Sequence, residues 1–363
     1  MRLCELRNLD LVTYENGMQM QQELVTLRQE ERIPDQLLLL QHPPVITLGR
    51  SGHEENLLAS PAALAAEGVR FYETTRGGDI TYHGPGQLVG YPLISLGEGR
   101  RDVRRYVTNL EEVIIRTVAA FGIEAGRWEG HRGVWVGREK IAAIGVRVAK
   151  WVTSHGFALN VDPNLHHFDL ITPCGIPDAG VTSIARLTGR SITVEEVREA
   201  LVPHFADVFE REIRPNPPDL ALVKVVVHDG NRILLLHRRP DSGDFWQPIT
   251  GRIEAGEVAE AAARREIVEE TGMGGEPESL DLRQSFLIEA KYLKDASDLP
   301  IFADEIAFAA WIDASRALRL DASEHDRYGW FSTEEALAKI RWSDDREAIE
   351  RLVVRALSAS AVG

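Results

Sequence analysis

Short apolar runs separated by polar turns divide the chain into alternating strand and helix segments. Between these runs, residues 102–121 repeat apolar positions every three or four residues, which predicts an amphipathic helix. A second helix is expected over residues 194–212, because Thr193 is a good N-cap and two glutamates follow in the first turn. The runs that predict strands are residues 36–41, 134–136, 141–148 and 156–161. Alternating elements of this kind predict an α/β or α+β fold.

Three prolines within residues 215–218 interrupt this pattern. Prolines so close together cannot continue a helix or a central strand. The pattern then starts again with two strands and, later, two helices, at residues 222–228, 232–238, 258–271 and 333–339. The sequence therefore predicts two domains, residues 1–215 and 216–363, each with helices and strands.

Length and charge narrow the class of protein. The chain has 363 residues, of which 44% are apolar, enough for two cores. Its net charge is −15, divided as −5 over residues 1–215 and −10 over residues 216–363. A chain this acidic is not expected to bind nucleic acid or an anionic membrane. Two cysteines, Cys4 and Cys174, exclude a disulfide framework and favour the cytoplasm, and no secretory signal or membrane span is expected.

Three glutamates share one face of the helix expected at residues 258–271. Glu266, Glu269 and Glu270 have the spacing i, i+3, i+4. Carboxylates packed in this way repel each other unless a cation offsets them, and Mg²⁺ or Mn²⁺ prefers such oxygen ligands. The pattern suggests a metal-assisted attack of water on a phosphoanhydride. Taken alone, it is more often a solvated acidic helix face.

The full spacing resembles the Nudix box, G-x5-E-x7-R-E-U-x-E-E-x-G-U, where U is apolar. The specified positions are met by Gly251, Glu257, Arg265, Glu266, Ile267, Glu269, Glu270, Gly272 and Met273. The resemblance implies a Nudix α/β/α sandwich in which the three glutamates bind the metal, Arg265 orients them and Gly251 shapes the loop. A further acidic ligand is expected from a later loop, and Glu324 is the candidate. Residues 237–250 and 323–331 resemble pyrophosphohydrolases of dATP or dihydroneopterin triphosphate, so a nucleotide or pterin triphosphate is the expected substrate.

The N-terminal half carries three segments whose residues could bind a substrate or take part in catalysis. Four glycines within residues 76–87 allow tight turns and a close approach of the backbone to a ligand. Lys140 directly precedes an apolar strand, and Cys174 lies in a Pro-Cys-Gly turn. A thiol becomes a good nucleophile when a neighbouring ammonium favours its thiolate. Together the segments suggest acyl transfer through a cysteine thioester.

These segments resemble the lipoyl(octanoyl) transferases. The matching stretches read RGGDITYHGPGQ, GREKIAAIGV, SHGFALNV and FDLITPCGI. The resemblance implies a fold like that of biotin and lipoate protein ligases, with Cys174 as nucleophile, Lys140 tuning it, and no cofactor. The implied substrate-binding residues are Arg76, Gly77, Gly78, Asp79, Ile80, Thr81, Tyr82, His83, Ala143, Ile144, Gly145, Gly156, Phe157 and Ala158. The implied partners are acyl carrier protein, as octanoyl donor, and lipoyl domains of 2-oxoacid dehydrogenases and the glycine-cleavage H protein.

Other functions fit parts of the same pattern. The N-terminal half has an ATP-dependent lipoate–protein ligase as its nearest alternative, and an octanoyl amidotransferase as a second. The ligase needs ATP but no thiol nucleophile, so the Pro-Cys-Gly turn favours transfer. The C-terminal half has a non-catalytic nucleotide sensor as its alternative, although a sensor has no need of the complete box.

Overall fold

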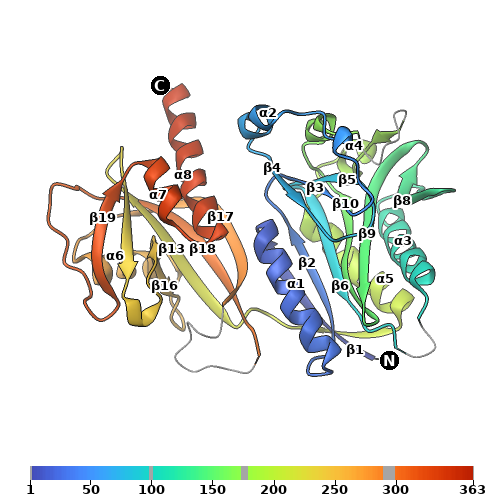
Figure 1. Ribbon diagram of the computed structural model, residues 1–363, viewed down its shortest axis with the longest axis horizontal. Helices are drawn as coiled ribbons and strands as arrows, with labels where there is room; N and C mark the ends of the chain where they lie inside the picture. Colours follow the sequence, from blue (N-terminus) through green and yellow to red (C-terminus); the bar gives the residue numbers. More distant parts are fainter. Residues whose placement is uncertain (1, 98–100, 173–178, 289–298, 363) are drawn as a thin grey trace. The chain divides into compact units, whose positions relative to one another are not determined.

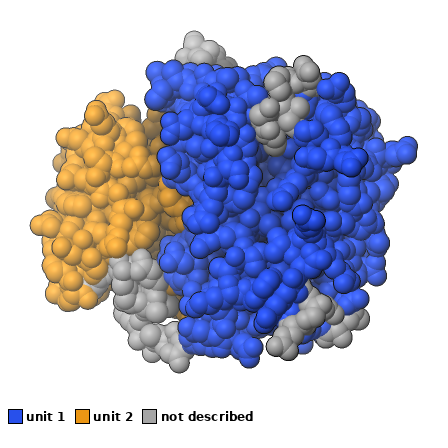
Figure 2. All heavy atoms as spheres, turned by 45° about the vertical axis from the view of Figure 1, so that its right-hand side comes forward, with its two compact units in different colours: residues 1–9, 17–217 blue, residues 10–16, 218–363 orange. Residues whose placement is uncertain are grey.

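The computed structural model describes residues 2–97, 101–172, 179–288 and 299–362 (Figure 1). The chain divides into two compact units, each described by itself below (Figure 2). Unit 1 consists of Met1–Leu9 and Gly17–Pro217, and unit 2 consists of Asp10–Asn16 and Pro218–Gly363. Among the described residues, no helix has both the length and the apolar character that a membrane span requires.

Unit 1 is built on a mixed sheet with the strand order β12-β1-β2-β6-β10-β9-β8-β7, and β11 pairs with β9. A second, three-stranded sheet has the order β4-β3-β5. The strands are β1 (Arg2–Leu11), β2 (Asp35–Gln41), β3 (Val45–Leu48), β4 (Arg70–Glu73), β5 (Ile80–His83), β6 (Gln87–Leu93), β7 (Gly126–Trp128), β8 (His131–Val136), β9 (Glu139–Ala149), β10 (Val152–Asn160), β11 (Gly180–Val181) and β12 (Arg211–Pro215). The predicted buried strands are confirmed within β2, β8, β9 and β10.

Two long helices of unit 1 pack on the large sheet through one apolar core. Leu110, Val113 and Ile114 of α3 and Leu201 and Phe205 of α5 are all buried in it. The α-helices are α1 (Tyr14–Gln29, beginning within the segment that belongs to unit 2), α2 (Pro61–Ala66), α3 (Val103–Ala119), α4 (Ile184–Thr188) and α5 (Val194–Phe209). The 3-10 helices among its described residues are η1 (Glu54–Asn56) and η2 (Leu165–Leu170). The amphipathic helix predicted over residues 102–121 is thus α3, buried along the face that the spacing indicates.

The helix predicted over residues 194–212 is too long by three residues. It begins as expected, with a capping box between Thr193 and Glu196, but ends at Phe209. Glu210 adopts the left-handed conformation (φ 54°), which ends the helix, and Arg211 opens β12. The sequence favours helix through Glu212, whereas tertiary contacts of Arg211 favour a strand.

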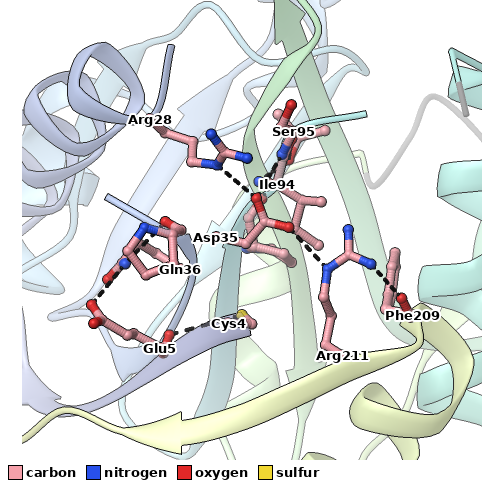
Figure 3. A network of polar contacts seen from close by, with 12 residues as sticks. Cys4, Glu5, Arg28, Asp35, Gln36, Ile94, Ser95, Phe209 and Arg211 are labelled. Atoms are coloured by element: carbon pink, nitrogen blue, oxygen red, sulfur yellow. Dashed lines mark hydrogen bonds and ion pairs between the residues drawn. The ribbon is translucent and has the colours of Figure 1, made fainter. Parts of the chain in front are cut away.

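Those contacts form a buried polar network around Asp35 (Figure 3). The Asp35 carboxylate accepts hydrogen bonds from Arg28 at 2.8 Å, Arg211 at 2.9 Å and the Ser95 backbone N–H at 3.0 Å. Asp35 and Arg211 are almost fully buried, so their charge-assisted hydrogen bond is shielded from water. Removing either partner would leave the other as an unpaired buried charge, which favours the strand that holds Arg211 in place. Cys4 lies nearby, buried, and burial raises the pKa of its thiol. Cys4 is therefore a structural residue rather than a nucleophile.

Unit 2 is a sheet with helices on both faces. The strand order is β15-β14-β13-β18-β17, β16 pairs with β13, and β19 pairs with β14. The strands are β13 (Leu220–His228), β14 (Ile233–Arg238), β15 (Trp246–Gln247), β16 (Ile249–Arg252), β17 (Pro277–Ile288), β18 (Ile301–Trp311) and β19 (His325–Phe331). The helices are α6 (Ala259–Thr271), α7 (Thr333–Lys339), α8 (Ser343–Val362) and the 3-10 helix η4 (Pro240–Ser242).

Alternation along β13 explains this layering. Val223, Val225 and Val227 lie in one apolar cluster, together with residues of α6. Val226 points to the other face, into a second cluster that includes residues of α7 and α8. The expected α/β/α sandwich is therefore confirmed, and with it the mixed α/β class of the whole chain.

A seven-residue N-terminal segment belongs to unit 2. Leu11 pairs in parallel with Gln284 of β17, and the Asp10 backbone N–H donates to the Ser285 hydroxyl at 3.0 Å. The Thr13 and Ser343 hydroxyls lie 2.6 Å apart, and Asn16 donates to Asp344 at 3.3 Å. The polypeptide thus completes part of unit 2 before it builds most of unit 1.

Asp344 also belongs to a buried cluster with more negative than positive charge. The Lys224 ammonium lies 2.8 Å from Glu305, 2.8 Å from Asp344 and 2.7 Å from Asp345. Burial raises the pKa of Glu305 to about 7 and that of Asp345 to about 6. One cation therefore faces three carboxylates, and the cluster holds a proton more readily in the folded than in the unfolded chain.

This excess charge predicts that unit 2 loses stability as the pH rises. A carboxyl group with a raised pKa binds more protons in the folded state, so the free energy of unfolding falls between the ordinary pKa of Glu305, 4.5, and its raised value of about 7. Glu305→Gln should flatten this slope and raise the free energy of unfolding at pH 8 by about 1–3 kcal/mol. Urea unfolding at pH 5.5 and pH 8 measures both. Glu334→Gln, at an exposed position, is the control. If Glu305→Gln instead lowers the stability at pH 8, this interpretation of the cluster is contradicted.

Candidate active sites

The structure brings together the three segments expected to bind substrate in unit 1. In the β9–β10 ladder, residues 143–145 pair one by one with residues 156–158, with Gly145 opposite Gly156. The loop at residues 76–78 closes on this ladder, because the Gly77 N–H donates to the Val146 carbonyl at 3.0 Å. A Cβ atom on Gly145 would lie 2.8 Å from the Gly77 carbonyl oxygen. Glycine is therefore required there for the close approach of loop and strand.

Two charged residues of this loop hold it in place. The buried Arg76 guanidinium donates to the Thr47 carbonyl at 2.7 Å and to the Thr47 hydroxyl at 2.8 Å. The Asp79 carboxylate accepts from Asn56 at 2.7 Å and from the Ile80 backbone N–H at 2.8 Å. These contacts connect the Gly-rich loop to β3 and η1, so it forms a fixed wall of the site.

Lys140 is buried beside an aromatic ring. It is 7% exposed, and its ammonium lies 4.6 Å from the centre of the Trp135 ring, a cation–π distance. Trp135 lies opposite Lys140 in the β8–β9 ladder. Trp135 thus both covers the side chain and stabilises its positive charge.

The Lys140 backbone is also tied to the chain that follows Cys174. Val181 pairs in parallel with Lys140, and the Thr182 N–H donates to the Lys140 carbonyl at 3.0 Å. Before the cysteine, the Thr172 N–H donates to the Asn56 carbonyl at 2.8 Å. Cys174 itself lies outside the described residues. The chain after it is therefore attached to the strand of Lys140, and the chain before it to η1, whose Asn56 contacts Asp79.

A group of buried histidines lies at the same site. Burial lowers the pKa of His83 to about 3, and it has the same effect on His155. The His42 imidazole Nε2 lies 2.6 Å from the Tyr91 hydroxyl, and the His42 and His83 rings are 5.8 Å apart. Both low-pKa rings are neutral at physiological pH. His83 was expected from the sequence, whereas His42, Tyr91 and His155 were not singled out as site residues.

In unit 2, the expected acidic face lies on α6 and is held by Arg265. The guanidinium lies 3.0 Å from Glu257, 2.6 Å from Glu266 and 3.1 Å from Glu269. It also donates to the Arg252 carbonyl at 2.7 Å. Hydrogen bonding to Arg265 lowers the pKa of Glu257, whereas burial raises that of Glu266. Arg265 therefore offsets part of the charge of three glutamates and fixes their direction.

The side chains of the Nudix box are of the chemical type that binds a divalent cation. Their donors are carboxylate oxygens, which Mg²⁺ and Mn²⁺ prefer. Gly251 forms a cradle for Glu266, because a Cβ atom at position 251 would overlap the Glu266 carboxylate. Gly272 caps α6 in the left-handed conformation (φ 68°), as expected. Within the described ranges, no three His, Cys, Asp or Glu side chains already form a metal-binding group.

The segment around Glu324 contacts the acidic face through the next residue, His325, which begins β19. Glu324 forms an ion pair with Arg238 at 3.2 Å. Its neighbour His325 is buried, and its Nδ1 lies 2.7 Å from the Glu270 carboxylate. The sequence did not indicate His325, because a histidine beside a glutamate has no spacing signature. Glu270, which Arg265 is not described as contacting, thus has the His325 imidazole as its neighbour.

Comparisons with known proteins match the two parts of the chain to two different families. Residues 13–206 match the model of the lipoyl protein ligase A/B catalytic domain, and residues 219–352 match that of the NUDIX domain. An octanoyltransferase from Myxococcus xanthus is 45% identical over 97% of this chain and 99% of its own length. An octanoyltransferase from Solibacter usitatus is 52% identical over 59% of this chain and 97% of its own. A structure of lipoate-protein ligase A bound with ATP has a TM-score of 0.51 at 16% identity, over 60% of this chain and 89% of its own, which shows a shared fold.

Unit 1 is therefore a lipoate-protein-ligase-like catalytic domain, and residues 219–352 form a NUDIX domain. With a relative that matches nearly end to end, the chain belongs to the octanoyltransferase family. It is a two-domain form of this family of acyltransferases. The relative from Solibacter usitatus matches only over 59% of this chain, so the transferase region also occurs without the second domain.

Proposed function

We propose that unit 1 transfers an octanoyl group from acyl carrier protein to the ε-amine of a lysine on a lipoyl domain, through a thioester on Cys174. The observation that carries this proposal is the placement of Lys140, buried against Trp135 and hydrogen-bonded to Thr182. An ammonium near a cysteine favours the thiolate of that cysteine, and the backbone of Lys140 is bonded to the segment that follows Cys174. A ligase that activates its substrate with ATP needs no thiol nucleophile.

Two displacements account for the transfer. The Cys174 thiol gives up its proton, its thiolate attacks the octanoyl thioester, the bond between the acyl carbon and the carrier sulfur breaks, and the carrier sulfur takes up the proton that Cys174 released. The acceptor amine then attacks the new thioester, the C–S bond to Cys174 breaks, an amide forms, and the amine proton passes to sulfur. Lys140 stabilises the thiolate in both steps, and Gly145 permits the close approach of the Gly-rich loop to β9 that forms this wall of the site.

The test compares acyl donors with a lipoyl domain as acceptor. Octanoyl-acyl carrier protein should give octanoylated product without ATP. A product that forms only from free octanoate and ATP identifies a ligase, and one that forms only from an octanoylated lipoyl domain identifies an amidotransferase. The acceptors we propose are lipoyl domains of 2-oxoacid dehydrogenases and the glycine-cleavage H protein. The cysteine content supports a reducing compartment such as the cytoplasm.

We infer that unit 2 hydrolyses a nucleoside or pterin triphosphate with Mg²⁺ or Mn²⁺. Glu266, Glu269 and Glu270 would hold the cation, with Glu324 as a further candidate, and the cation would supply an activated water. The fixed position of Arg265 among the glutamates supports this role. Release of phosphate or pyrophosphate across a panel of triphosphates, with and without Mg²⁺, tests it. No release from any of them favours a nucleotide sensor.

A further inference from the structure

His83 ends the expected substrate-binding segment, and its surroundings specify which ring nitrogen carries the proton. It lies at the end of β5, 8% exposed. Its Nδ1 is 2.7 Å from the side-chain oxygen or nitrogen of Gln87, whichever faces it. An amide can present either group to an imidazole, so the neighbours of Gln87 decide between them.

Two backbone carbonyls, of Thr182 and Tyr82, fix the direction of the hydrogen bonds that link Asn160, Gln87 and His83. The Thr182 carbonyl only accepts, so Asn160 places its NH₂ group there, at 3.0 Å, and its oxygen faces Gln87. The Gln87 NH₂ group donates to that oxygen at 2.9 Å and to the Tyr82 carbonyl at 3.2 Å. The Gln87 oxygen therefore faces His83 and accepts from it. Nδ1 must carry the proton, because reversing either amide would set two acceptors against each other.

The other ring nitrogen, Nε2, is then the acceptor of a neutral imidazole. The ring stays neutral because burial, with a smaller effect from His42, lowers the pKa of His83 to about 3. Arg76 and His155 also face it and act in the same direction, and the Gln87 hydrogen bond opposes them. In the part of the chain that the structure describes, Nε2 makes no hydrogen bond. An acceptor without a partner among the described residues is thus held ready on the wall of the site.

The hydrogen-bonded series His83, Gln87, Asn160 and Thr182, here called the relay, is attached to the backbone of Lys140. Thr182 accepts from Asn160 through its carbonyl and donates to the Lys140 carbonyl through its N–H. Gln87 is 2% exposed, Asn160 3% and Thr182 0%, so water does not compete for these hydrogen bonds. The relay therefore sets the position of the His83 ring relative to the backbone of Lys140.

We propose that Gln87 and Asn160 are positioning residues that hold His83 with its proton on Nδ1, so that Nε2 accepts a hydrogen bond from the amine of the incoming lysine. This role rests on the transferase function proposed above. A neutral amine that donates one N–H to Nε2 keeps its lone pair for the thioester carbon. The C–N bond forms, the C–S bond breaks, and the amine proton goes to sulfur, so that His83 gains no proton overall.

The protonation of His83 is measured directly by ¹⁵N NMR of the full chain with labelled histidine. The signals of His83 are assigned by their loss in His83→Gln. We expect a protonated Nδ1 and an unprotonated Nε2 at pH 7, unchanged down to pH 5. A proton on Nε2, or an imidazolium at pH 6, overturns the relay. This measurement does not depend on activity, so it separates failure of the relay from failure of the transferase function.

Gln87→Glu tests the role of the relay in transfer. A carboxylate that accepts from Nδ1 stabilises the imidazolium and raises the pKa of His83, and a protonated Nε2 cannot accept. Below that new pKa, kcat/KM should fall about tenfold for each pH unit, and above it the activity should return toward that of the wild type. Gln41→Glu is the matched control, because Gln41 accepts from the Gly86 N–H at 2.8 Å and not from His83.

The shape of the pH profile decides between positioning and a merely structural role. If Gln87→Glu lowers kcat/KM by the same factor at every pH, its role is structural and the proposal is overturned. If Gln41→Glu shifts the profile equally, the relay is not its cause and the proposal is likewise overturned. If the wild type transfers no octanoyl group while His83 has the expected tautomer, the relay exists but Nε2 does not have the assigned role.

Discussion

Replacing Lys140 with methionine is expected to slow octanoyl transfer by about 10²–10⁴-fold. Methionine keeps most of the apolar stem and its packing against Trp135, but removes the ammonium that lies 4.6 Å from the ring. Without a neighbouring cation, the Cys174 thiol is mostly protonated at neutral pH and is a poor nucleophile. The loss should appear in the rate at which the octanoyl-enzyme forms, measured by rapid quenching and mass analysis.

Lys150→Met is the matched control for this experiment. Lys150 follows directly after β9, the strand at whose start Lys140 lies, and its side chain is exposed. Its replacement should leave the rate within about twofold, since an exposed lysine of this kind has no role in the site. Equal rates in the wild type and Lys140→Met would show that Lys140 does not activate the nucleophile.

Replacing Glu269 with glutamine is expected to lower metal-dependent hydrolysis by about 10²–10³-fold and to leave octanoyl transfer unchanged. Glutamine has the shape of glutamate but lacks the charge that holds a divalent cation. Chelation with EDTA should have the same selective effect, because only unit 2 is expected to need a metal. The two activities are measured on one preparation, as phosphate or pyrophosphate release and as product mass.

The control here is Glu276→Gln. Glu276 is an exposed residue of the same unit, and its only described role is an ion pair with Arg264 at 2.6 Å. Its replacement should change neither activity. A Glu269 variant that hydrolyses triphosphates as fast as the wild type would rule out this residue as a ligand of the catalytic metal.

Much of the fold and of both sites was predictable because the signals are local. The box at residues 251–273 has its spacing on one loop and one helix, so α6 and its cap at Gly272 follow directly from the pattern. Apolar runs and amphipathic spacing likewise predict β2, α3 and α7, each within one or two residues. In such segments, local propensity and tertiary packing favour the same structure.

The features that the sequence did not predict depend on contacts between distant residues. Arg211 starts a strand because its partner is Asp35, 176 positions away. Gln87 and Asn160 meet 73 positions apart, and Lys224 finds Asp344 at a separation of 120. Residues 10–16 resemble the end of a strand and carry no sign that they belong to unit 2. Pairings of this kind follow from topology, which composition and periodicity do not determine.

The most direct test of the central claim is the intact mass of the protein after mixing with octanoyl-acyl carrier protein, beside Cys174→Ala. We expect one octanoyl adduct on the wild type and none on the variant, and transfer of that adduct to a lipoyl domain without ATP. An adduct that persists in Cys174→Ala would place the nucleophile elsewhere. No adduct on the wild type, with a donor shown to be active, would contradict a covalent transferase mechanism for this chain.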